Sequence, residues 1–101
     1  MNTDLAAQGF SAMGSGSRLE VLKTLVRAGD PGLPVSLIQS RTGIAASTLT
    51  HHLKNLAAAG LIDQQRDGRT INVQANYEHL RGLAAFILAE CCVEQEGTQD
   101  E

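Results

Sequence analysis

The sequence predicts a mostly helical domain with one small β-hairpin, and two observations support this fold class. Residues 41–61 carry leucines at helical spacing, and Gly60 ends this helical stretch, which is typical of an amphipathic helix. The next segment, LIDQQRDGRTINVQ, is typical of two short strands around a turn at RDG, with Ile71 and Val73 alternating with polar residues in the second strand. In 101 residues, 43% of them hydrophobic, we expect a single domain with a modest core.

The helix within residues 41–61 is predicted to have one packing face and one open face. Leu49, Leu53 and Leu56 lie at positions i, i+4 and i+7 and form an apolar stripe. At about 100° per residue, the opposite face carries Ser47, Thr50, His51 and Lys54. Such hydrogen-bonding and cationic groups suit a helix that contacts DNA. His52 lies beside the stripe, where we expect a half-buried, hydrogen-bonded imidazole.

The elements on either side of this helix predict a DNA-binding unit. Upstream, VSLIQSRT forms a short helix with Leu37 and Ile38 facing inward, and Gly43 supplies a tight turn. Two helices joined in this way make a helix-turn-helix, whose second helix enters the major groove. The hairpin that follows is a wing, and its Arg66 and Arg69 would reach phosphate or the minor groove. The order of elements therefore predicts a winged helix-turn-helix that binds double-stranded DNA.

Two further helices are expected before this unit. The first covers residues 2–13 with Thr3 as N-cap, and the second begins at Ser15 or Ser17 and ends at Gly29. The second helix would face the core with four apolar residues, Leu19, Leu22, Leu25 and Val26. The segment PGLP then forms a rigid connector to the helix-turn-helix.

A final apolar helix is expected from about residue 77 to about residue 93, with Asn76 as its cap. It carries a heptad-like seam of Tyr77, Leu80, Ala84, Ile87 and Cys91, broadened by Leu83 and Leu88. This helix is too apolar to cover so small a body on one side only, so we interpret it as a dimerisation helix. A homodimer formed through terminal helices would place two recognition helices about one DNA turn apart, as a palindromic operator requires.

The charge distribution agrees with a DNA-binding body followed by an acidic tail. The net charge is −3, yet residues 1–81 hold all eight Lys and Arg against six carboxylates, a balance of +2. We therefore divide the chain into a DNA-binding and dimerisation domain, residues 1–93, and a disordered acidic tail, residues 94–101.

No segment has the pattern of a signal peptide or a membrane span, so we expect a cytoplasmic protein with reduced cysteines and no membrane partner. Neither a catalytic Ser/His/Asp or Cys/His set nor a phosphate-binding loop stands out. The chain is therefore not expected to be an enzyme.

With these elements in place, the chain resembles the ArsR/SmtB family of small metal-responsive repressors. The matching segments are FSAMGSGSRLEVLKTLV, STLTHHLKNLAAAGLI and RDGRTINV, which together cover roughly residues 10–90. The resemblance implies that residues 47–54 read DNA and that RDGR is the wing tip. It places four side chains near bases or phosphates, namely Ser47, Thr48, Thr50 and His51, and it places Arg66 and Arg69 on the backbone. Ala46 departs from the Gln often found at its position and has no hydrogen-bonding side chain.

Members of this family usually release DNA when an inducer binds, and the position of the inducer site varies. The pattern of two cysteines in the first helix of the DNA-binding unit is absent. The zinc-binding pattern of the last helix is absent too, because His79 has no partner ligand there. We expect His79 to be a surface residue. The only cysteines are Cys91 and Cys92. They resemble the branch of the family in which a Cys-Cys pair near the chain end binds arsenic.

Paired thiolates favour soft centres, so trivalent arsenic or antimony is the expected inducer, and no permanent cofactor is expected. Arsenite prefers three sulfurs, but no third cysteine follows the pair. An organoarsenical such as methylarsenite needs only two sulfurs because one valence is already on carbon, and we expect it to bind at least as well as arsenite. Arsenite with water, or with a sulfur from the partner subunit, is a further possibility.

Two other interpretations of the cysteine pair stay open. One cysteine could simply pack as a small apolar residue. Alternatively, the pair could be a redox or persulfide switch in the same fold. A disulfide between adjacent residues would be strained, because consecutive Cα atoms lie about 3.8 Å apart, whereas disulfides usually span about 4.4–6.8 Å. A helix C-terminus and nearby carboxylates also disfavour a reactive thiolate.

Overall fold

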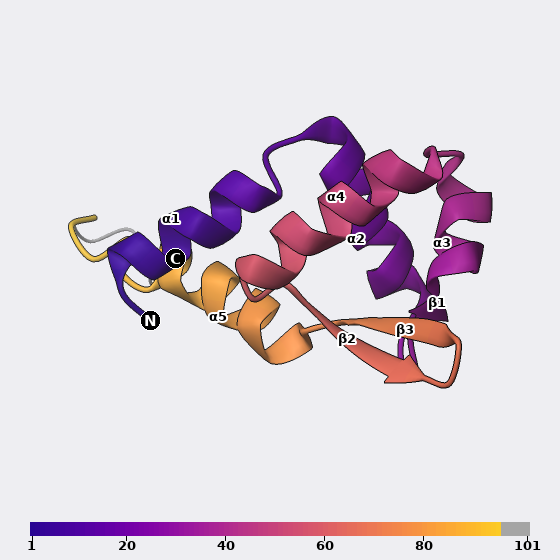
Figure 1. Cartoon of the computed structure of the whole chain (residues 1–101). Helices are drawn as coiled ribbons and strands as arrows, with labels where there is room; N and C mark the ends of the chain where they lie inside the picture. The colour runs from indigo at the N-terminus through magenta and orange to yellow at the C-terminus, as the bar shows by residue number, and fades with distance from the viewer. Residues whose placement is uncertain (96–101) are drawn as a thin grey trace.

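Five helices and three short strands make up residues 1–95, the part of the chain that the computed structural model describes (Figure 1). Their order along the chain is α1 (Thr3–Ala12), α2 (Gly16–Ala28), β1 (Leu33–Pro34), α3 (Val35–Thr42), α4 (Ala46–Ala58), β2 (Ile62–Asp67), β3 (Thr70–Ala75) and α5 (Tyr77–Leu88). Helices α3 and α4 form the helix-turn-helix, and β2 and β3 form the wing. The predicted fold class, a mostly helical winged helix-turn-helix, is confirmed.

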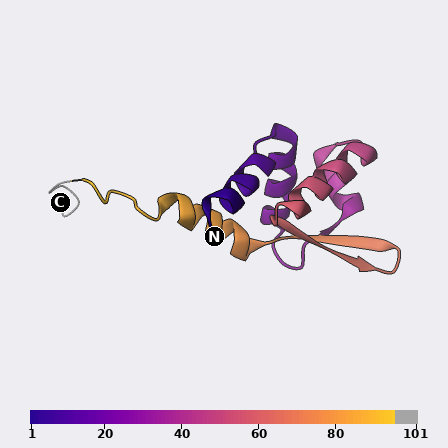
Figure 2. The ribbon, with the colours of Figure 1, turned by 60° about the vertical axis from the view of Figure 1, so that its left-hand side comes forward.

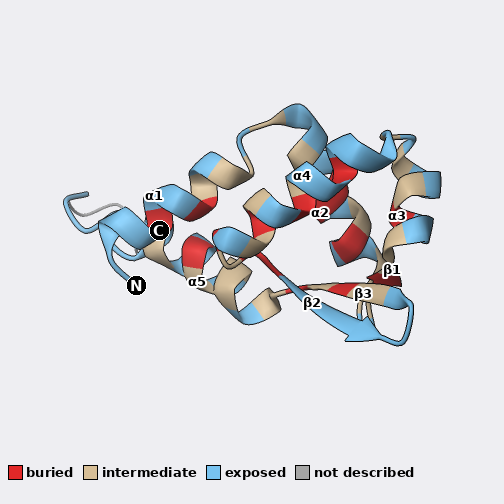
Figure 3. Cartoon of the chain, viewed as in Figure 1, coloured by how far each residue is buried: buried red, intermediate tan, exposed pale blue. Residues whose placement is uncertain are grey.

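The core lies where α2, α3 and α4 meet the sheet, and Figure 3 shows buried positions on the facing sides of these elements. The predicted stripe on α4 is confirmed, because Leu49, Leu53 and Leu56 are all buried. From α2 and α3, the buried side chains are Val21, Leu22, Leu25 and Ile38. Burial of each large apolar side chain contributes roughly 1.5–3 kcal/mol. The buried side chains of α2, α3 and α4 therefore supply much of the free energy that stabilises the fold.

Three apolar residues expected in the core are exposed instead. The exposed fractions are 41% for Leu19, 44% for Val26 and 41% for Leu37. In α2, Val21, Leu22 and Leu25 define the inward face, and at about 100° per residue Leu19 and Val26 point roughly 100° away from its centre. The prediction was therefore wrong for these three side chains, and it missed Val21.

The sheet has one strand more than the predicted hairpin. The strand order is β1-β3-β2, and all pairs are antiparallel. Leu33, in the segment expected to be only a connector, pairs with Val73 of β3. Gly32 makes this approach possible: its φ is +91°, and a side chain there would collide with the Val73 carbonyl. The side-chain amides of Asn72 and Gln74 also donate to the Pro31 carbonyl, at 2.7 and 3.0 Å.

Helix caps differ from the prediction at one position. Asn2, not Thr3, caps α1, because the backbone N–H of Leu5 donates to the Asn2 Oδ1 at 2.8 Å. The Asn2 amide oxygen satisfies one of the free N–H groups of the first turn, so the helix starts at Thr3. Ser15 at the start of α2, Gly29 at its end and Asn76 at the start of α5 are confirmed.

Helix α5 is shorter than predicted, because it ends at Leu88 and not near residue 93. Ile87 and Leu88 are 66% and 62% exposed, so the end of the helix has no packing surface within the chain, and turns follow. Figure 2 shows the chain after α5 leaving the body on the side opposite the wing. The predicted tail falls outside the described residues from residue 96 onward.

Candidate nucleic-acid interface

The outer face of α4 is open to solvent along its length (Figure 3). The residues predicted to contact DNA from this helix are all exposed: Ser47, Thr48, Thr50, His51 and Lys54. The Thr50 hydroxyl donates to the Ala46 carbonyl at 3.0 Å, which leaves its oxygen lone pairs available to accept a hydrogen bond. The His51 Nε2 lies 3.4 Å from the Asn55 amide nitrogen one turn along the same helix. The buried stripe thus fixes α4 while its polar groups face outward.

The wing ends in a two-residue turn of Gly68 and Arg69, since Asp67 pairs with Thr70. Gly68 has φ +65°, a conformation that glycine adopts without strain, and this keeps the turn tight. Arg66 and Arg69 are both exposed. Within residues 1–95 the only ion pair joins Lys23 and Glu20, at 4.0 Å, so neither arginine is neutralised by a carboxylate there.

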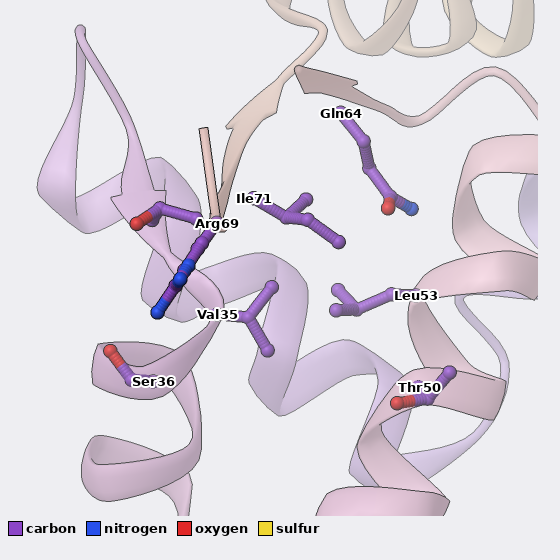
Figure 4. Close-up of a pocket in the computed structure, with 8 residues that line it drawn as sticks. Val35, Ser36, Thr50, Leu53, Gln64, Arg69 and Ile71 are labelled. Carbon is purple, nitrogen blue, oxygen red and sulfur yellow. The ribbon is translucent and has the colours of Figure 1, made fainter. Parts of the chain in front are cut away.

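Between α3, α4 and the wing lies a cavity of about 400 Å³ (Figure 4). It brings together two of the predicted site residues, Thr50 and Arg69, whereas Arg66 lines a separate hollow on the Pro31 side of the hairpin. Sequence reasoning missed three polar residues of this cavity, Ser36, Gln64 and Thr70. No local pattern singles them out, because only the packing of three elements brings them to one place.

His52 is half-buried, as predicted, but the predicted hydrogen bond is absent at one ring nitrogen. Its Nδ1 is buried and has no hydrogen-bond partner among the described residues. Burial lowers the pKa of His52, and the positive charge of Arg18 and the neighbouring His51 lower it further. The imidazole is therefore held toward its neutral form.

His79 is not the surface residue that the sequence predicts. Its ring lies against Gly60, which has φ +82°, and its Nε2 is buried without a hydrogen-bond partner in the described part of the chain. The backbone N–H of His79 donates to the Asn76 Oδ1 at 3.0 Å. The cap holds the first turn of α5 against the end of α4, so the ring is covered.

The two cysteines lie in the turns beyond α5, at the end of the molecule opposite the wing (Figures 1 and 2). Both are exposed, and their sulfurs are 3.3 Å apart without a disulfide bond. Cys92 has φ +66°, so the backbone leaves helical geometry between the two residues. A hydrogen bond with the Cys91 thiol, together with partial desolvation, raises the pKa of Cys92. Residues 1–95 contain no cluster of three or more His, Cys, Asp or Glu side chains that could hold a metal ion.

In the described chain no helix has the length and apolar character needed to cross a bilayer.

Comparison with known proteins agrees with the observed fold. A helix-turn-helix domain family matches residues 13–65, just over half of the chain. The chain is 31% identical over 91 residues to the HTH-type transcriptional regulator YgaV of Escherichia coli, covering 90% of each protein.

A second relative is the putative arsenical resistance operon repressor ArsR2 of Halobacterium salinarum, 35% identical over 68 residues, which cover 67% of this chain and 55% of that protein. Among solved structures, the homodimeric winged helix-turn-helix domain Mb0332 of Mycobacterium bovis, a possible ArsR-family regulator, superposes with a TM-score of 0.70. It is 22% identical, and the match covers 95% of this chain and 87% of that one. The chain belongs to the ArsR family of winged helix-turn-helix DNA-binding transcriptional regulators.

Proposed function

We propose that the protein is a homodimeric repressor that binds a palindromic operator and is released from it by trivalent arsenic or antimony at Cys91 and Cys92. The observation that carries the DNA-binding part is the open polar face of α4 beside a wing with two unneutralised arginines. A duplex on this surface would receive α4 in its major groove, with the wing along the backbone or the minor groove.

The side chains differ in what they would contribute to DNA binding. Ser47, Thr50 and His51 carry groups that can hydrogen-bond to base edges or phosphates, and Lys54 adds a positive charge at the side of the groove. Arg66 and Arg69 would bind phosphates and so contribute to affinity more than to sequence preference. Thr48, in the first turn of α4, would contact the DNA backbone. Ala45 precedes α4 without a side-chain cap, so the first N–H groups of the helix are open to a phosphate.

Dimerisation is supported by apolar side chains that the chain leaves uncovered on its terminal helices. Met1 and Leu5 at the N-terminus are 49% and 40% exposed, and Ile87 and Leu88 of α5 are 66% and 62% exposed. Helices α1 and α5 pack on each other, with Leu83 against Gly9, so these side chains belong to one end of the molecule. A second copy of the chain would cover this surface, as the homodimeric state of Mb0332 suggests.

A DNA mobility assay with the region upstream of the protein's own gene tests the DNA-binding proposal. We expect a retarded complex of one dimer per site, weakened at least tenfold by Thr50→Ala combined with His51→Ala. The matched control is Lys23→Ala, an exposed cation on α2 away from α4 and the wing, which should leave binding unchanged. A protein that binds no fragment of this region, or whose binding is insensitive to the α4 substitutions, would contradict the proposal.

The arsenic part of the proposal is supported by the sulfur geometry. Two exposed thiols 3.3 Å apart can both bond to a single soft atom, and the turn at Cys92 removes the divergence that helical neighbours would have. With methylarsenite, each thiol would replace one hydroxyl group on arsenic and release one water, while arsenic stays trivalent. The relative named as an arsenical resistance operon repressor agrees with this chemistry. No third cysteine is present, which favours an organoarsenical.

Titration of the reduced protein with methylarsenite and with arsenite tests this assignment. We expect methylarsenite to bind one per chain, at least as tightly as arsenite, and Cys91→Ser with Cys92→Ser to abolish binding of both. Arsenite binding far more tightly than methylarsenite would contradict the organoarsenical preference. Unchanged binding by the double variant would contradict the site itself.

A thiol redox or persulfide switch is the second candidate, because the same 3.3 Å separation places one sulfur within reach of an oxidised form of the other. The raised pKa of Cys92 works against it, because the thiolate is the reactive species. Treatment with an organic persulfide in the absence of arsenic distinguishes the two. Release of DNA under those conditions, reversed by dithiothreitol, would favour the redox switch.

A further inference from the structure

The cavity between the helix-turn-helix and the wing has the composition of a ligand site. Its floor is apolar and consists of Val35 from α3, Leu53 from α4 and Ile71 from β3, which point toward the same space in Figure 4. Its volume of about 400 Å³ falls in the range of small-molecule pockets, roughly 300–1,000 Å³. Helices α3 and α4 and both strands of the wing line it, so an occupant would contact the recognition helix and the wing at once.

The rim of this cavity is polar and positively charged. Arg69 contributes its guanidinium from the wing turn, and the Gln64 amide reaches in from β2 (Figure 4). The hydroxyl of Ser36 from α3 lies on the same side as Arg69, and the hydroxyl of Thr50 from α4 lies on the opposite side (Figure 4). No lining residue is acidic, and Arg69 has no ion-pair partner within residues 1–95. One free guanidinium above an apolar floor matches a ligand with a single anionic end and a hydrocarbon body.

We propose that this cavity binds a small monocarboxylic acid with an apolar body about the size of benzoate, its carboxylate on Arg69 and its hydrocarbon part on Val35, Leu53 and Ile71. A phosphate group of the DNA backbone is the competing occupant, but it would leave the apolar floor without a partner. The Ser36 hydroxyl, on the same side of the cavity as Arg69 (Figure 4), can donate a further hydrogen bond to the carboxylate.

Such a ligand would interfere with DNA binding, and this consequence rests on the proposed function. Thr50 and Arg69 belong both to the cavity and to the proposed DNA-contacting surface. A bound acid would neutralise Arg69 and occupy the space between α4 and the wing. The wing, which lines the cavity, and the segment after α5, which carries the cysteines, lie at opposite ends of the chain (Figure 2), so the acid and the arsenical would act through separate sites.

The test uses benzoate as the probe, with the full-length protein and no DNA. Binding is followed by the methyl NMR signals of Leu53 and Ile71, which report contact with the cavity floor. We expect a dissociation constant of about 1 mM or tighter, and binding at least tenfold weaker for Arg69→Gln. Arg66→Gln is the matched control, because it removes the same charge from the same hairpin but lies outside the cavity. Benzamide, which has the ring without the charge, should bind at least tenfold more weakly than benzoate.

Several results would overturn the proposal. If millimolar benzoate does not shift the methyl NMR signals of Leu53 and Ile71, benzoate does not bind in the cavity. If Arg66→Gln and Arg69→Gln lose the same amount of benzoate affinity, benzoate is held by general charge attraction and not by the cavity. If inorganic phosphate binds as tightly as benzoate, the cavity is a site for a phosphate of the DNA backbone. Addition of operator DNA in a second step separates the two hypotheses. If the protein binds benzoate but no DNA, the cavity proposal holds and the proposed DNA-binding function is contradicted.

Discussion

Helices α4 and α5 use their apolar side chains differently. Helix α4 buries Leu49, Leu53 and Leu56 inside its own chain, whereas α5 buries only Leu83 and leaves Ile87 and Leu88 exposed. The recognition end of the molecule is therefore complete in one chain. The end that carries α1, α5 and the cysteines has apolar surface that only a second molecule would cover. We therefore expect stability to depend mainly on α4 and assembly mainly on α5.

The largest effect is expected from a cavity in the recognition end. Leu56→Ala removes a side chain with no exposed surface and should lower the free energy of unfolding by about 2–5 kcal/mol. Urea unfolding followed by circular dichroism measures this change. Ala58→Gly, on the exposed side of the same helix, should cost only about 1 kcal/mol. Similar losses for the two variants would show that the α4 stripe is not the main core.

A charge in the middle of the exposed α5 surface tests the other end. Ile87→Glu should weaken dimerisation by at least a hundredfold, about 3 kcal/mol, because the carboxylate would be buried at the interface without a partner. Sedimentation velocity over a range of concentrations measures the dimer dissociation constant. Val26→Glu places the same charge on an α2 residue that is also exposed and should leave dimerisation unchanged. An Ile87→Glu protein that stays dimeric would locate the interface elsewhere.

Helices α4 and α5 also differ in how their N-termini are capped. We expect cap substitutions to change the free energy of unfolding less than the two substitutions above. Asn76 caps α5 through the His79 N–H, whereas Ala45 offers α4 no side-chain cap. Asn76→Ala should cost about 1 kcal/mol of stability, whereas Ala45→Ser should stabilise the protein slightly in the absence of DNA. Thermal unfolding monitored by calorimetry gives both values. A loss on Ala45→Ser larger than that on Asn76→Ala would show that the helix starts are assigned wrongly.

The smallest expected effect is a pH dependence from His52. Because its pKa is lowered in the folded protein, the unfolded chain takes up a proton at higher pH, near 6.5. The free energy of unfolding should therefore decrease as the pH falls below about 6.5, and His52→Gln should remove this part of the decrease. Unfolding midpoints in urea between neutral and mildly acidic pH measure it. His51→Gln, at the exposed neighbour, should keep most of the dependence; the same pH profile in both variants would refute the assignment.

The sequence predicted the features that depend on local pattern and missed those that depend on distant packing. The α4 stripe and the wing were recognisable because their residues are close in the chain. Strand β1 was missed because Leu33 becomes a strand only by pairing with Val73, forty positions away. The end of α5 was misplaced because apolar composition continues past Leu88 after packing has stopped. The cavity was not predictable because Val35, Leu53 and Ile71 come from three elements.

We expect capture of an arsenical at Cys91 and Cys92 to change DNA affinity at the recognition helix and wing, which lie at the other end of each chain (Figure 2). Fluorescence anisotropy with labelled operator DNA, in the presence and absence of methylarsenite, measures this coupling directly. We expect a loss of affinity of tenfold or more, within the usual range of about 1–3 kcal/mol for coupled sites, and no response from Cys91→Ser with Cys92→Ser. Unchanged affinity of the wild-type protein at saturating methylarsenite, or an equal response from the double variant, would contradict the account.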